Sequence, residues 1–92
     1  MNQNIKHIAK HYGFQHQVKK TTEECGEFIV ALSKLANGDG TQADVLEEMA
    51  DVMVMLEQIR YFLGIRSSEL HKTMDAKVCR QLKRMKNECE NT

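Results

Sequence analysis

The stretch Asn37-Gly38-Asp39-Gly40 decides the fold, because it is the clearest interruption of helical pattern in this 92-residue sequence. Two glycines and two turn-forming polar residues within four positions end a helix that precedes them. Thr41 follows directly, and a threonine hydroxyl at this position can cap the first turn of a new helix. The sequence therefore predicts two long helices joined by a short turn, which is an antiparallel helical hairpin.

Apolar residues recur every three or four positions on both sides of this turn, as one face of a helix requires. The helix before the turn is expected from about Phe14 to Ala36. The helix after it is expected from its cap at Thr41 to its end at Gly64. The predicted apolar stripes are Val18, Thr21, Cys25, Phe28, Leu32 and Leu35 in the first helix, and Val45, Met49, Val52, Leu56, Ile59 and Leu63 in the second.

Two further helices are expected, one on each side of the hairpin. The first covers about residues 2–12 and ends at Gly13, and the last follows a predicted cap at Ser67. The absence of proline and of alternating β-branched runs favours helices throughout. The predicted fold is all-α, a single-domain bundle of four helices over residues 1–92. The face of the last helix expected to point inward is formed by Leu70, Met74, Val78, Leu82 and Met85.

A chain of this length builds only a marginal core. Packing of apolar stripes between copies would compensate, so we expect a homo-dimer or homo-tetramer. No apolar run approaches the ~20 residues that span a bilayer, and no signal-peptide hydrophobic region is present, so no membrane association is expected. The three cysteines follow no metal-ligand spacing, which predicts reduced thiols in a cytoplasmic protein. A formal net charge of zero argues against nonspecific nucleic-acid binding.

The two long helices carry the same acidic pattern at an offset of 24 residues. Glu24 and Glu27 lie three positions apart in the first helix, as do Glu48 and Asp51 in the second. At about 100° per residue, each pair lies along the border of its apolar stripe. If the helices pack antiparallel by their stripes, the four carboxylates can converge on one side of the hairpin.

A solvated or ion-paired helix edge is the alternative explanation for such acids. Glu27, Glu48 and Asp51 have no Lys or Arg three or four positions away, whereas Lys20 lies four positions before Glu24. Two carboxylates ~6 Å apart repel by about 3 kcal/mol at an effective dielectric near ~20. A hard divalent cation removes this repulsion, and Mg²⁺ is the usual ion where phosphates complete the coordination. The pattern therefore favours a Mg²⁺ site over a solvated edge.

Basic residues follow one border of the apolar stripe in the last helix. Lys77, Arg80 and Arg84 lie at positions i, i+3 and i+7, and such side chains suit phosphate oxygens. Taken alone, an ordinary charged helix face is the more frequent explanation of this spacing. An acidic metal site together with a basic edge, however, is what a Mg²⁺-polyphosphate ligand requires.

Glu24-x-x-Glu27 followed by Glu48-x-x-Asp51, each preceded by another glutamate, resembles the EExxE…ExxD signature of the MazG-like all-α nucleotide pyrophosphohydrolase superfamily. The likeness extends over about residues 17–84. It implies a four- to five-helix fold that is dimeric or a dimer of dimers, with active sites that draw on more than one subunit. It also implies that a nucleoside triphosphate is hydrolysed at the α–β phosphoanhydride to a monophosphate and pyrophosphate.

The resemblance assigns roles to eight residues. Glu24, Glu27, Glu48 and Asp51 would be both the Mg²⁺ ligands and the catalytic residues. The residues expected to bind substrate are Gln17, Lys77, Arg80 and Arg84. Two alternatives stay open: the related phosphoribosyl-ATP pyrophosphohydrolase of histidine biosynthesis, and a non-catalytic helical interaction module.

Overall fold

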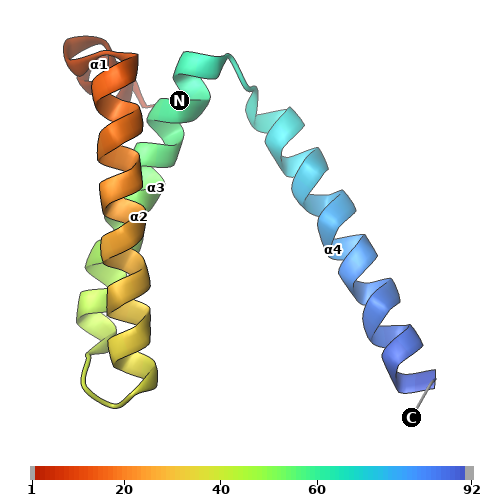
Figure 1. Ribbon diagram of the computed structural model, residues 1–92. Coiled ribbons are helices and arrows are strands. Elements are labelled where there is room, and N and C mark those ends of the chain that lie inside the picture. Colours follow the sequence, from red (N-terminus) through yellow and green to blue (C-terminus); the bar gives the residue numbers. More distant parts are fainter. Residues whose placement is uncertain (1, 91–92) are drawn as a thin grey trace.

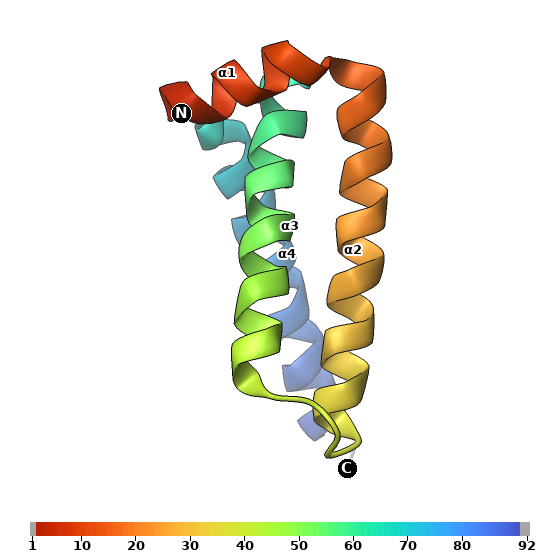
Figure 2. The ribbon, with the colours of Figure 1, turned by 90° about the vertical axis from the view of Figure 1, so that its left-hand side faces the viewer.

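The computed structural model describes residues 2–90, with side chains from 2 to 88. It contains helices α1 (Gln3–Tyr12), α2 (Phe14–Ala36), α3 (Gln42–Leu63) and α4 (Ser67–Glu90), and residues 2–90 form no strand. α2 and α3 run antiparallel, and α1 crosses one end of the pair (Figures 1 and 2). The all-α prediction and the helical hairpin are confirmed. Among the described residues, no helix is both long enough and apolar enough to cross a membrane.

The turn between α2 and α3 has the structure that its glycines and threonine predict. Gly38 adopts a φ of 81°, which residues with a side chain rarely reach. At Gly40, a Cβ atom would lie 2.9 Å from the backbone nitrogen of Leu35, so glycine is required there for lack of space. The Thr41 hydroxyl accepts a hydrogen bond from the Asp44 N–H at 3.1 Å, which confirms the predicted cap of α3.

The connection between α3 and α4 is short. α3 ends at Gly64, whose φ of 65° is the left-handed conformation common after a helix. The N–H of Leu70 donates to the carbonyl of Arg66 at 3.1 Å, so α4 already begins at Ser67. The predicted capping role of Ser67 is therefore wrong: this residue lies inside the helix, and its hydroxyl contacts Nδ1 of His71 at 3.3 Å.

In α3 the predicted stripe residue Val45 is buried, whereas in α2 the seam lies beside the predicted apolar stripe. Val18 and Leu32, both from the predicted stripe of α2, are 38% and 42% exposed. A pair of helices covers only a narrow strip of each partner, and here that strip is displaced towards the acidic edge. The outer part of each stripe is consequently left uncovered. The buried residues are Ala9 in α1, Gln17, Glu24 and Ala31 in α2, and Val45, Met55 and Gln58 in α3.

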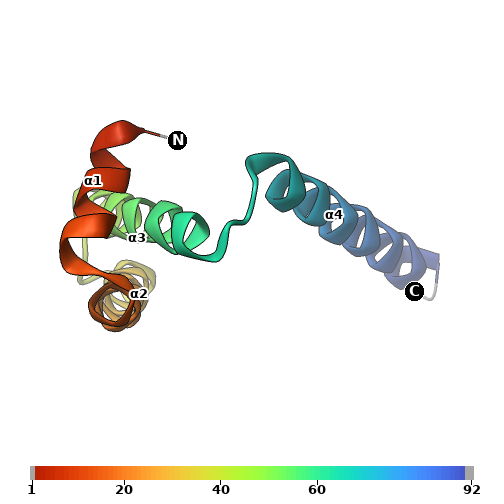
Figure 3. The ribbon, with the colours of Figure 1, turned by 90° about the horizontal axis from the view of Figure 1, so that it is seen from above.

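Helix α4 extends away from the other three (Figures 1 and 3). Over residues 67–90 it contacts none of α1, α2 and α3. Its expected inward face is exposed along its length, from Leu70 at 39% to Leu82 at 59%, so the prediction that this face packs within the chain is wrong. The Cα radius of gyration is 16.9 Å, whereas a compact domain of this length would have about 12 Å. One chain alone therefore leaves much apolar surface uncovered.

Candidate metal centre

Three carboxylates converge at the seam between α2 and α3. Glu24 and Glu27 come from α2 and Glu48 from α3, and one oxygen of each lies within 4.8 Å of the others. The spacing of three residues brings the two acids of α2 to one edge of the helix, and the antiparallel α3 presents Glu48 to them. Glu24 is buried, Glu48 is half-buried and Glu27 is exposed. We call Glu24, Glu27 and Glu48 the acidic cluster.

The acidic cluster is short of positive charge. Oε2 of Glu24 and Oε2 of Glu48 are shielded from solvent and have no hydrogen-bond partner among the described residues. Burial of the Glu48 carboxyl raises its pKa above the ordinary value, and the negative charges of Glu27, Asp51 and Glu24 add to this effect. Buried oxygens without a donor and mutual repulsion both cost free energy that a bound cation would offset.

Asp51 lies beside the acidic cluster and is not part of it. It is one helical turn after Glu48 in α3 and is exposed, and its carboxylate lies outside the group of three oxygens. Its charge nevertheless contributes to the raised pKa of Glu48. The structure thus brings three of the four predicted metal ligands together, with the fourth close by.

Two open hollows flank the acidic cluster. One has a volume of about 700 Å³ and is lined by Glu24 and Asp51, among others. The other has a volume of about 810 Å³ and is lined by Glu27 and Glu48. A ligand bound at the cluster would therefore have space on either side of it.

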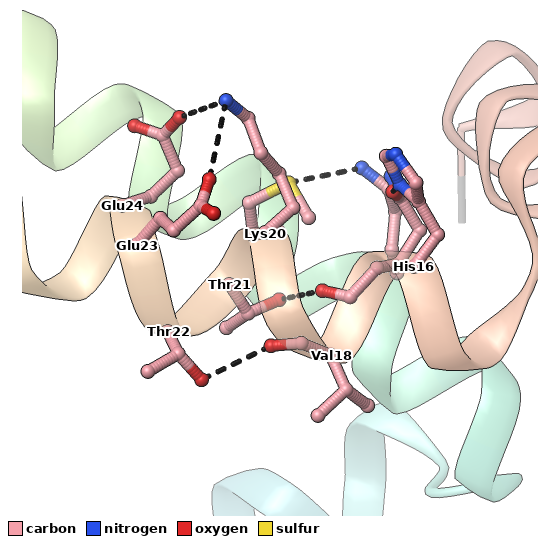
Figure 4. A network of polar contacts seen from close by, with 10 residues as sticks. His16, Val18, Lys20, Thr21, Thr22, Glu23 and Glu24 are labelled. Atoms are coloured by element: carbon pink, nitrogen blue, oxygen red, sulfur yellow. Dashed lines mark hydrogen bonds and ion pairs between the residues drawn. The ribbon is translucent and has the colours of Figure 1, made fainter.

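Lys20 lines the first hollow, and its ammonium group points to Glu24 and Glu23 (Figure 4). Its Nζ lies 3.1 Å from Oε1 of Glu24 and 3.9 Å from Oε2 of Glu23. The hydrogen bond to Glu24 and the negative charge of that residue raise the pKa of Lys20 above its ordinary value. This ion pair neutralises part of the charge of Glu24 but leaves its Oε2 without a partner.

Gln17 lines the first hollow, but its amide is engaged in a link between α2 and α3. Its Nε2 donates to Oε1 of Gln58 at 2.7 Å, and its Oε1 lies 2.7 Å from Nδ1 of His16. Both glutamines are almost fully buried, with 3% and 1% exposed. The predicted contact of Gln17 with substrate would require this pair to open. No motif in the sequence indicated Gln58. Its position could have been noticed only because a polar residue stands there between the apolar residues Met55 and Ile59.

The three basic residues expected to bind substrate all lie on α4. Because α4 contacts none of α1–α3 over residues 67–90, Lys77, Arg80 and Arg84 do not meet the acidic cluster of their own chain. Within one chain the acidic cluster and the basic edge of α4 therefore do not form one site, since the connection after Gly64 directs α4 outward.

Comparison with known proteins found no matching family model, no matching curated protein and no matching solved structure. The resemblance to the MazG-like superfamily therefore rests on the sequence motifs alone. What the site does has to be argued from the geometry of its own side chains.

Proposed function

We propose that this chain is a Mg²⁺-dependent nucleotide pyrophosphohydrolase that cleaves nucleoside triphosphates between the α and β phosphates. The observation that carries the proposal is the convergence of Glu24, Glu27 and Glu48, with two buried oxygens that have no hydrogen-bond partner within the described part of the chain. All donors are carboxylate oxygens, the ligand type that Mg²⁺ prefers. The EExxE…ExxD spacing, which includes Asp51, supports the reaction class.

In this proposal the residues of the acidic cluster hold the ion. Bound Mg²⁺ would polarise phosphate oxygens and lower the pKa of a coordinated water. Asp51, which lies outside the group of three oxygens, is placed either to complete the coordination or to accept the proton of the attacking water. The hollow that Asp51 shares with Glu24 offers space for a triphosphate.

We further propose that two chains associate, with α4 of each covering the other. The exposed apolar face of α4 and the exposed apolar surface of α2 and α3 would then cover each other, in a reciprocal interface. Charge supports the same arrangement, because α4 carries Lys77, Arg80 and Arg84 whereas the hairpin carries the acidic cluster. Basic residues of one chain would bind the phosphates of a nucleotide held by the other.

Release of pyrophosphate tests the proposed activity. Wild-type protein is incubated with Mg²⁺ and a panel of canonical and modified nucleoside triphosphates, with phosphoribosyl-ATP included to separate the two related activities. We expect turnover of at least one compound, and loss of that turnover in Glu48→Gln. Glu47→Gln is the matched control, since Glu47 is exposed and lies outside the acidic cluster. A folded wild type without turnover, or full activity of Glu48→Gln, would overturn the proposal.

A further inference from the structure

Lys20 and a bound metal ion would compete for the carboxylate of Glu24. Its Nζ lies 3.1 Å from Oε1 of Glu24, a carboxylate whose side chain is only 9% exposed. The other oxygen of Glu24 is buried without a partner. Glu24 is thus held from one side by a lysine, while its remaining oxygen faces no donor.

A divalent ion bound to Glu24 would repel the ammonium of Lys20. Mg²⁺ approaches its oxygen ligands to about 2 Å, so two cations would compete for one carboxylate. Lys20 can leave at little cost, because its side chain is 46% exposed and its ion pair joins residues of a single helix. A flexible lysine with three N–H donors then requires a new acceptor.

The hollow beside Lys20 indicates where that acceptor comes from. Lys20 lines this hollow together with Lys19, Glu24 and Asp51. A triphosphate bound to a metal ion on Glu24 would bring oxygen acceptors into the same hollow. Phosphate oxygens are strong acceptors for an ammonium group.

We propose that Lys20 is a substrate-binding residue that exchanges partners, from Glu24 in the free protein to a phosphate oxygen of the metal-nucleotide. This inference rests on the proposed function. It has a thermodynamic consequence: a free metal ion has to displace Lys20, whereas a metal-nucleotide displaces it and also supplies its new partner. Metal and nucleotide therefore bind with positive coupling, to which Lys20 contributes.

Mn²⁺ serves as the probe, because its free concentration is measured directly by electron paramagnetic resonance. Binding of Mn²⁺ alone is followed in this way, and binding of the preformed complex of Mn²⁺ with a non-hydrolysable nucleoside triphosphate by isothermal titration calorimetry, for wild type, Lys20→Met and Lys20→Arg. Lys10→Met is the matched control, an exposed lysine on α1 that lines neither hollow. Circular dichroism confirms that each variant is folded, which is expected because methionine is a good helix former.

We expect Lys20→Met to bind Mn²⁺ alone about tenfold more tightly, and the Mn²⁺-nucleotide about tenfold more weakly, than wild type. Lys20→Arg should retain the coupling, and Lys10→Met should match wild type. Binding of Mn²⁺ alone and of the Mn²⁺-nucleotide that tightens by the same factor in Lys20→Met would overturn the phosphate contact, since Lys20 would then only balance Glu24. Unchanged Mn²⁺ binding in Lys20→Met would overturn the exchange altogether.

These outcomes separate the role of Lys20 from the proposed function. If wild type binds Mn²⁺ and turns over nucleotide while Lys20→Met behaves identically, only the inference about Lys20 fails. If neither protein binds Mn²⁺ while both are folded, the metal site itself is refuted, and the proposed function fails together with this inference.

Discussion

Replacing Leu82 by alanine tests whether α4 covers a second chain. Leu82 is 59% exposed and lies in the apolar face of α4, which contacts no other helix over residues 67–90. Burial of a whole leucine side chain contributes about 1.5–3 kcal/mol, so covering the exposed part of Leu82 would contribute about 1–2 kcal/mol. A reciprocal dimer contains this contact twice, which gives about 2–4 kcal/mol in total.

Such a loss corresponds to an increase in the dimer dissociation constant of about 30- to 700-fold. The assay is sedimentation equilibrium over a range of concentrations, with a monomer mass of 10.6 kDa as reference. Lys83→Ala is the control, because it removes a neighbouring exposed side chain without reducing the apolar face. A wild type that stays monomeric at high micromolar concentration would refute the reasoning, as would a Leu82→Ala protein that dimerises as tightly as wild type.

Three further predictions concern the hairpin and its acids. Gly40→Ala should destabilise the fold by about 1–3 kcal/mol in thermal unfolding, because its Cβ would meet the backbone 2.9 Å away. Gly26→Ala, where a Cβ meets nothing within 4 Å in a helix, should instead stabilise it by about 0.5–1 kcal/mol; equal shifts in the two variants would contradict this. Arg60 lowers the pKa of Glu57 below 4.5 through a hydrogen bond, so this carboxylate contributes stability above pH 4.5 that is lost as the pH falls through the lowered pKa. Glu57→Gln should therefore be less stable by under about 1 kcal/mol at pH 7, and a gap from wild type that persists at pH 2 in urea unfolding would argue against it. Glu48→Gln should be more stable than wild type in EDTA because it relieves repulsion, and Mg²⁺ should raise the unfolding midpoint of wild type alone; a Mg²⁺ response in both proteins would exclude Glu48 as a ligand.

The helical hairpin could be predicted because its signals are local. Gly38 and Gly40 act through their own backbone conformation and the space around one atom, and Thr41 acts on an N–H three residues away. None of these effects depends on which other helices are present. Helix ends at Gly13 and Gly64 were predicted for the same reason, since a positive φ at a glycine ends a helix in any context.

The rotation of the helices could not be predicted from the pattern, because it depends on which surfaces cover which. The apolar stripe of α2 shows that Val18 and Leu32 require a covering surface, and it does not show from which molecule that surface comes. The hydrogen bond between Gln17 and Gln58 joins residues 41 positions apart, and neither side chain belongs to an apolar pattern. The same limit applies to α4, whose amphipathic face is the same whether it packs within its chain or on another.

The burial of Glu24 connects the acidic cluster with the exposed apolar surface. Had α2 packed on α3 through Val18 and Leu32, the acids would have stayed at a solvated edge, where they require no counter-ion. Instead Glu24 lies in the seam with Gln17 and Ala31, where a carboxylate requires positive charge, and Val18 and Leu32 are exposed, where they require a partner. The same rotation of α2 about its axis buries Glu24 and exposes Val18 and Leu32. Helix α4 of a second chain is apolar on one face and basic along the border of that face. It therefore has the composition to cover the exposed apolar residues of α2 and to bring positive charge towards Glu24.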